Sequence, residues 1–187
     1  MKNTLFIITL AILSTGCMTT PALPDEQRPI QWGTSLDKQH NFYQISNHVF
    51  RSEQPSQEFI PQLQHYKIQN IINLRQSKDD FKILENQPYN IIHIPIRTWA
   101  IDREDMLQVM KNIKQIQQRG ENVLIHCYHG SDRTGASIAM YRILFENWTI
   151  EQATQEMKHG GYGFHSIWKN IEHLFTEENI TWIRQRL

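Results

Sequence analysis

The sequence has few cysteines, no excess of charge of either sign and no hydrophobic run long enough to span a membrane. Two cysteines among 187 residues exclude a fold that several disulfides hold together. Nineteen basic and nineteen acidic side chains cancel, so the chain lacks the positive charge typical of nucleic-acid-binding proteins, and we expect no nucleic-acid partner. Internal repeats are also absent. At this length, with 40% hydrophobic residues, the chain is expected to form one globular domain with its own core.

The first residues have the features of an export signal. Lys2 precedes an apolar run, Leu5–Leu13, which is shorter than the roughly 20 residues that a membrane-spanning helix needs. Small residues then lead into Cys17. This arrangement resembles the lipobox of bacterial lipoproteins, although the leucine lies four positions before the cysteine and the usual preference is three.

The lipobox resemblance implies a signal peptide over residues 1–16, a lipid on Cys17 and attachment to a membrane on its periplasmic side. Met18 stands where an aspartate would favour the inner membrane, so the outer membrane is favoured; the alternative is a soluble periplasmic protein. Residues 17–40 are expected to form the lipidated amino terminus and a tether, because Thr19–Gln31 contains three prolines and few apolar residues. The globular domain is then expected over residues 41–187.

Short apolar runs of strand length alternate with segments of helical periodicity from Val49 onward. The expected strands are Val49–Phe50, Ile68–Leu74, Ile91–Ile96 and Val123–Ile125, and the expected helices are Ser56–Tyr66, Asp105–Gln118, Thr134–Glu146, Ile150–Lys158, Ser166–Phe175 and Glu177–Arg186. This alternation predicts a single α/β domain with a mostly parallel central sheet flanked by helices.

The residues that carry chemistry lie between the strand expected at Val123–Ile125 and the helix that follows it. Their sequence is His126-Cys127-Tyr128-His129-Gly130-Ser131-Asp132-Arg133-Thr134-Gly135. Open α/β sheets bind ligands at such loops, where backbone N–H groups at a helix amino end attract an anion. The helix end and Arg133 both favour the thiolate form of Cys127, and Arg133 can bind two phosphoryl oxygens side by side. The pattern therefore predicts a thiolate that attacks phosphorus.

Two other interpretations of this loop fail on chemistry. His126, Cys127 and His129 could ligate a metal ion, but Arg133 in the same loop would repel a dication, so we expect neither a metal nor another cofactor. The segment from residue 130 to residue 137 half-matches a nucleotide-binding P-loop. Ala136, however, occupies the position of the lysine that such a loop needs.

The loop resembles the His-Cys-x5-Arg-Ser/Thr signature of the cysteine-dependent protein tyrosine phosphatase superfamily, and most closely its small bacterial dual-specificity-like members of the periplasmic type. The resemblance runs from about Ile45 to the carboxyl end and includes Phe50–Ser56 and Gly160–Gly163. It implies that Cys127 forms a phosphocysteine and that Arg133 stabilises the transition state. The residues that it implies for phosphate binding are Tyr128, His129, Gly130, Ser131, Asp132 and Arg133, with Thr134 bonded to Cys127 and His126 supporting the loop.

The same resemblance implies a general acid on the loop formed by residues 97–105. Asp102 is expected to protonate the leaving oxygen. Asp105 is expected to cap or open the next helix and is the alternative acid. Some relatives place the acid near the position of Ala100, which cannot donate a proton. The alternative that neither Asp102 nor Asp105 is the general acid therefore also stays open.

The substrate class is expected to be phosphotyrosine. Lipid phosphatases of the superfamily often carry lysines in this loop, whereas here Asp132 would oppose a polyanionic head group. Phosphoserine, phosphothreonine, phosphoinositides and small phosphate esters stay open, as does a weakly active module that only binds phosphorylated ligands. The expected partners are thus a phosphorylated protein or a small phosphate ester, and a membrane through the lipid on Cys17.

Overall fold

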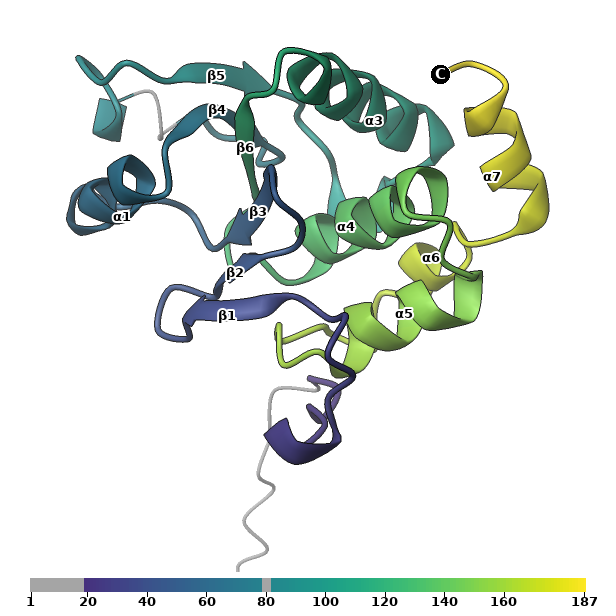
Figure 1. Cartoon of the computed structure of the whole chain (residues 1–187). Helices are drawn as coiled ribbons and strands as arrows, with labels where there is room; N and C mark the ends of the chain where they lie inside the picture. Colours follow the sequence, from purple (N-terminus) through teal and green to yellow (C-terminus); the bar gives the residue numbers. More distant parts are fainter. Residues whose placement is uncertain (1–18, 79–81) are drawn as a thin grey trace, which may run out of the picture.

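A computed structural model describes residues 19–78 and 82–187 (Figure 1), so the predicted signal peptide and Cys17 lie outside the described residues. In this part of the chain one sheet has the strand order β1-β2-β3-β6-β4-β5. The strands are β1 (Thr34–Asp37), β2 (Phe42–Gln44), β3 (Val49–Ser52), β4 (Ile68–Asn73), β5 (Asn90–His93) and β6 (Asn122–His126). Strands β3, β6, β4 and β5 are parallel, and β1 and β2 add an antiparallel edge. The predicted α/β domain with a mostly parallel sheet is confirmed.

Helices cover both faces of the sheet (Figure 1). The smaller face carries α1 (Ile60–His65), and the larger carries α3 (Arg103–Gln118), α4 (Asp132–Phe145), α5 (Ile150–His159), α6 (Lys169–Glu172) and α7 (Glu177–Arg184). Three short 3-10 helices are η1 (Asp25–Gln27), η2 (Gln57–Phe59) and η3 (Thr98–Ala100).

Side chains that alternate along the strands build two cores. Val49 and Val123 face the larger helical layer, and their neighbours Phe50 and Leu124 face α1. Helix α4 lies in the middle of the larger layer, against β6, α3, α5 and α7, and most of its residues are buried. A helix that is buried on all sides is held rigidly, which fixes the position of the loop that enters its amino end.

Several predicted elements have different ends in the structure. Helix α3 begins at Arg103, before the predicted start, because Asp102 and Asp105 form a reciprocal capping box. The helix predicted at Ser166–Phe175 is reduced to the four residues of α6. Strands β1 and β2 were not predicted, since they have only four and three residues and β1 lies at the open edge of the sheet.

Residues 19–33, which we call the N-terminal strap, pack against the domain. Thr20 N donates to Phe164 O at 2.8 Å, and Leu23 N donates to His159 O at 2.9 Å. Trp32 is buried. This packing contradicts the predicted tether from Thr19 onward, and because β1 also precedes residue 41, the domain begins before the predicted boundary. The strap needs few apolar residues, since backbone hydrogen bonds to the C-terminal part of the chain hold it.

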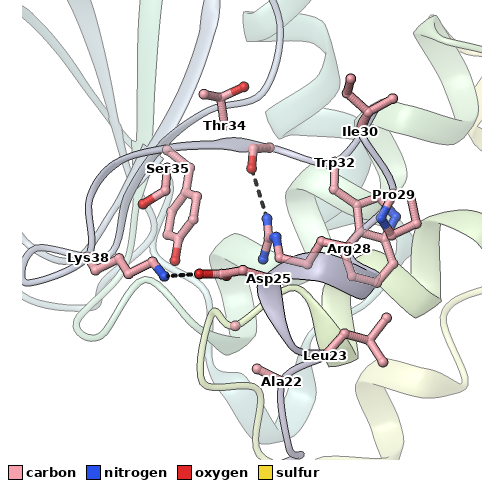
Figure 2. A pocket seen from close by; sticks show the side chains of 13 residues that line it. Ala22, Leu23, Asp25, Arg28, Pro29, Ile30, Trp32, Thr34, Ser35 and Lys38 are labelled. Atoms are coloured by element: carbon pink, nitrogen blue, oxygen red, sulfur yellow. Dashed lines mark hydrogen bonds and ion pairs between the residues drawn. The ribbon is translucent and has the colours of Figure 1, made fainter.

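Arg28 joins the strap to the rest of the molecule (Figure 2). Its guanidinium donates to Gly160 O and, at 2.9 Å, to Gly33 O. The Cζ atom of Arg28 lies 5.6 Å from the ring centroid of Trp32, 5.9 Å from that of Tyr43 and 5.8 Å from that of Tyr162. One side chain therefore connects the strap, strand β2 and the glycine-rich turn that follows α5.

We expect Arg28→Ala to lower the free energy of unfolding by about 1–3 kcal/mol, because it removes hydrogen bonds from a charged donor and leaves the Gly160 and Gly33 carbonyls without that partner. Urea denaturation measures the change. Lys38→Ala is the matched control, since the ion pair of Lys38 with Asp25 is 66% and 71% exposed and its loss should leave the unfolding midpoint unchanged. Equal losses in the two variants would contradict a special role for Arg28.

Candidate active site

The loop that contains Cys127 and leads to Arg133, which we call the chemical loop, connects the end of β6 to the start of α4. Strand β6 lies between β3 and β4 in the middle of the sheet, and all three run parallel, so their carboxyl ends meet at this edge. Cys127 follows directly after β6 and is 3% exposed, with a free thiol. The structure thus places the predicted nucleophile at the carboxyl edge of the sheet and near the amino end of the most buried helix.

The carbonyl oxygens of this loop point away from its centre. Tyr128 O accepts from Gln54 N at 3.0 Å, His129 O accepts from Asn41 Nδ2 at 2.8 Å, and Gly130 O accepts from Arg51 Nη2. The N–H group of each of these peptides points the opposite way. Within the described residues, none of the backbone N–H groups from residue 128 to residue 133 donates a hydrogen bond to another residue. The loop is therefore a cradle of free donors at a helix amino end, which suits an anion.

Gly130 is required by the packing of this cradle. Its φ of +71° lies in the left-handed region, where other residues are strained. A Cβ atom at this position would lie 2.6 Å from Ser52 C and 2.8 Å from Glu53 N, so the loop touches the end of β3 backbone to backbone. The close approach leaves no room for a side chain.

Arg133 lies in the first turn of α4 and points across the ends of two neighbouring strands. Its Nη1 donates to Leu74 O at 3.3 Å and to Ile96 O at 3.2 Å, both just beyond the ends of β4 and β5. Arg133 lines a cavity of about 320 Å³ together with Trp99 and Tyr128, which are 63% and 54% exposed. The cavity combines a cationic group with aromatic walls, and it can receive an anion that is attached to a flat apolar group.

Arg75 adds a second cation to this cavity. Its Cζ lies 5.0 Å from the ring centroid of Tyr128, and its Nη1 donates to Gln54 Oε1. Since Gln54 N also bonds Tyr128 O, Arg75 and Gln54 hold the start of the loop from the β3 side.

The two supporting residues implied by the family resemblance are both buried. His126 has its Nδ1 3.0 Å from Cys127 O, next to the loop. The Oγ1 atom of Thr134 makes no hydrogen bond within the part of the chain that the structure describes, so the implied bond to Cys127 is not formed here.

Asp132, expected in the phosphate-binding set, turns its carboxylate toward the C-terminal part of the chain. Its Oδ1 accepts from His165 N at 2.9 Å, and its Oδ2 lies 2.9 Å from His165 Nδ1. Because the Asp132 carboxylate is bound by His165, it is less free to oppose a polyanionic substrate than the sequence suggested. The side chain of Asp132 instead ties the loop to the segment that pairs with Thr19 of the strap.

The structure does not bring Asp102 into the cavity of Arg133. Asp102 Oδ1 accepts from Asp105 N at 2.9 Å as the cap of α3, and Asp105 Oδ2 accepts from Asp102 N at 3.2 Å. Asp102 lines a separate cavity of about 340 Å³ with Asn170 and His173. Burial raises the pKa of Asp105. The role of Asp102 as general acid stays a prediction.

Sequence reasoning missed Asn41 and His165, which hold the loop from outside the signature. Asn41 Nδ2 donates to both His129 O and, at 3.0 Å, Tyr162 O, so it joins the loop to the glycine-rich turn. Asn41 lies in a left-handed conformation after a charged stretch, and only that turn-forming character was visible in the sequence.

Other features of the described residues are separate from this site. A cavity of about 480 Å³ lies between the strap and β1 and has no lining residue from the loop (Figure 2). No three His, Cys, Asp or Glu side chains within residues 19–78 and 82–187 gather closely enough to hold a metal ion. Across the same residues, no helix has both the length and the hydrophobicity of a membrane span.

Comparisons with known proteins match this region of the chain. The family model for the dual specificity phosphatase catalytic domain matches residues 49–176. The chain is similar to the dual specificity protein phosphatase TpbA of Pseudomonas aeruginosa, with 31% identity over 132 residues, which are 71% of this chain and 60% of TpbA. It is also similar to the protein phosphatase Slingshot homolog 3 of Mus musculus, with 23% identity over 63% of this chain and 18% of that protein. The chain thus spans less than two thirds of the length of these relatives.

Solved structures of phosphatases also match the fold of this chain. A crystal structure of a cysteine-to-serine variant of P. aeruginosa TpbA in complex with phosphotyrosine has a TM-score of 0.77 and 27% identity, covering 85% of this chain and 97% of that chain. The crystal structure of Tk-PTP in its active form has a TM-score of 0.60 and 18% identity, covering 79% of this chain and 98% of that chain. At that identity, Tk-PTP supports the fold alone.

Gly130→Ala should destroy the cradle, because the added methyl group overlaps the end of β3. We expect it to abolish binding of inorganic phosphate, measured as protection of the protein from thermal unfolding. Gly120→Ala is a matched control, since Gly120 also has a positive φ of +68° but has open space around the Cβ position. That control should cost about 1–2 kcal/mol of stability through backbone strain and keep phosphate binding. Phosphate binding by Gly130→Ala at the level of the control would contradict the packing argument.

Proposed function

Because the chain belongs to the family of dual specificity phosphatase catalytic domains, we propose that it hydrolyses phosphotyrosine monoesters, and also phosphoserine or phosphothreonine esters, through a phosphocysteine. This membership confirms the superfamily expected from the sequence. The observation that carries the proposal is the cradle of free N–H groups above Cys127, with Arg133 beside it. The TpbA variant that was solved with phosphotyrosine supports the substrate class.

The proposed reaction has two steps, both at phosphorus. In the first, the Cys127 thiolate forms an S–P bond while the bond from phosphorus to the leaving oxygen breaks, and that oxygen takes a proton. In the second, a water molecule gives a proton to the proposed donor carboxylate, Asp102, and forms a new P–O bond, while the S–P bond breaks and phosphate leaves with the thiolate regenerated. Arg133 and the loop N–H groups stabilise the negative charge on the phosphoryl oxygens throughout.

The shape of the cavity favours phosphotyrosine over shorter phosphorylated side chains. The exposed side chains of Trp99 and Tyr128 line the same cavity as Arg133, so an ester whose phosphate binds Arg133 would lie beside these rings. The long, flat side chain of phosphotyrosine can bring its phosphate to the cradle while its ring contacts these aromatic walls. Phosphoserine is shorter and has no ring to use the same contacts.

The proposed proton donor is Asp102, which has to approach the leaving oxygen from its place as the cap of α3. Its Oδ2 accepts no hydrogen bond from a described residue, whereas Oδ1 holds the cap. Catalytic hydrogen bonds often form only when substrate is bound, so the separation in the free protein is compatible with this role. Movement of η3 and the adjoining loop residues would bring the two cavities together.

A second candidate function is the capture of phosphorylated ligands without efficient turnover. One observation favours it: no carboxylate from the described part of the chain lines the cavity that contains Arg133. A site with a cradle and an arginine but no proton donor would bind phosphotyrosine and release the leaving group slowly.

We further propose that the protein is exported and that Cys17 carries the lipid which holds it to a membrane, with the outer membrane favoured. The support is the apolar run Leu5–Leu13 followed by small residues and Cys17. Fractionation of cells that produce wild type or Cys17→Ser tests this, and a wild-type protein in the soluble fraction would refute the lipid anchor.

We expect the purified wild type to hydrolyse phosphotyrosine peptide and p-nitrophenyl phosphate, and Cys127→Ser to lose measurable hydrolysis of both, because a serine hydroxyl is a far weaker nucleophile than a thiolate. Released phosphate is the measurement. Cys17→Ser removes the other cysteine and should retain full activity. A wild-type rate no higher than that of Cys127→Ser refutes hydrolysis, and tight binding of the peptide by both proteins would then favour the binding module.

Two substitutions of Asp102 separate its capping role from proton donation. Asparagine caps a helix about as well as aspartate but donates no acid proton, so Asp102→Asn should lower phosphotyrosine hydrolysis by about 10²-fold or more and change p-nitrophenyl phosphate hydrolysis far less. The aryl leaving group of the second substrate needs little protonation. Loss of activity in Asp102→Ala alone, accompanied by a lower unfolding midpoint, would show that the residue serves only as the cap.

A further inference from the structure

Arg51 is a fully buried charge beneath the chemical loop. It lies on β3, where it pairs with Ile125 of β6, and its exposed fraction is 0%. A guanidinium that leaves water is costly unless hydrogen bonds or opposite charges compensate it. The surroundings of Arg51 should therefore contain the group that makes this charge tolerable.

The compensation is not a direct ion pair with a described carboxylate. Arg51 donates from Nη2 to Gly130 O, and its Cζ lies 3.7 Å from the ring centroid of Tyr162. Its Nε and Nη1 have no hydrogen-bond partner within residues 19–78 and 82–187. Arg142 is almost as deeply buried, but a direct ion pair compensates its charge, since its Nε donates to Glu156 Oε2 at 2.8 Å.

The groups around Arg51 that can carry a negative charge include the Glu156 carboxylate and the Cys127 thiolate. Burial lowers the pKa of Arg51, and electrostatic attraction to Tyr162, Glu156, Cys127 and Tyr43 acts against this effect. Coulomb attraction is mutual, so any stabilisation that the thiolate gives Arg51 is returned to the thiolate. Arg51 comes from a strand outside the signature loop, yet it pairs with Ile125, two residues before Cys127, and its guanidinium bonds Gly130, three residues after Cys127.

We propose that Arg51 is a positioning residue for the phosphatase reaction, which turns the Gly130 peptide so that its N–H side faces the cradle and holds a positive charge beneath Cys127. This inference rests on the proposed function, because it concerns the same loop and the same nucleophile. Its geometry combines the bond to Gly130 with the backbone contact between Gly130 and the end of β3. The cradle is thus held from below by a cation and from the side by a strand.

Other titratable groups lie on the loop and on the elements packed around it, and they must be kept unchanged in any test. They are Tyr43 of β2, His126 of β6, Asp132 and Arg133 of α4, Glu156 of α5, and the neighbouring His40, Glu53, His129, Tyr162 and His165. Substitution of Arg51 alone leaves all of them in place, so a changed pH profile would report on its charge.

The test follows the alkylation of Cys127 by iodoacetate across pH, read at the Cys127 peptide by mass spectrometry. Arg51→Gln removes the charge and keeps a donor, and it should react about tenfold more slowly at neutral pH, with its rate profile moved to higher pH. Arg51→Lys keeps the charge and should retain the wild-type profile. Leu63→Ala, in the core on the α1 side, is the control for lost stability and should also retain it.

A folded Arg51→Gln with the wild-type profile overturns the proposal, and so does an Arg51→Lys that slows as much as Arg51→Gln. If Arg51→Gln does not fold, Arg51→Lys carries the test. Because lysine lacks the planar fork that reaches Gly130, inorganic phosphate should protect Cys127 about threefold less well than in wild type, and equal protection overturns the proposal.

These measurements need no turnover, so they are separate from the test of hydrolysis. A wild type that hydrolyses no ester but shows the shifted alkylation profile in Arg51→Gln would refute the proposed phosphatase and leave the role of Arg51 in place. An active wild type with an unshifted Arg51→Gln profile would refute only Arg51.

Discussion

The chemistry of this protein depends on backbone N–H groups that the protein itself leaves without acceptors. In the described structure the six consecutive loop residues Tyr128–Arg133 leave their backbone N–H groups without acceptors, which costs free energy wherever such a group is shielded from water. The loop would relax into internal hydrogen bonds if its carbonyl groups were free to turn. Asn41, Gln54 and Arg51 prevent this by bonding three successive carbonyls from outside.

The groups that hold the cradle are themselves held by a buried polar network. Glu156 accepts from Gly33 N at 2.7 Å, from the Tyr162 hydroxyl at 3.0 Å and from two nitrogens of Arg142. One carboxylate thereby connects the N-terminal strap, the glycine-rich turn and helix α4. Burial and the Glu156 carboxylate raise the pKa of Tyr162, so this hydroxyl stays neutral and its ring faces the Arg51 cation. Such a network is stable only when all its members are present.

The central part of the fold and the chemical loop could be predicted from sequence because both have strong local signals. Apolar runs mark β4 and β6, and the spacing from Cys127 to Arg133 is specific. The strap could not be predicted, since its order comes from backbone hydrogen bonds to residues far along the chain, such as Phe164 and His159. No local pattern encodes these bonds. The part played by Asp132 was also hidden, because a carboxylate in a loop sequence does not reveal that His165 will bind it.

The isolated β-bridge between Thr19 and His165 limits how far the domain can lie from the residues that precede Thr19. His165 bonds Asp132 at the start of α4, so the strap is fixed to the domain close to the chemical loop. With the proposed lipid on Cys17, two residues separate Thr19 from the bilayer, a reach of roughly 7 Å. A longer, free tether would let the domain sweep a wide volume of the periplasm. If Cys17 carries the proposed lipid, this attachment would instead keep the domain within a thin layer above the lipid surface.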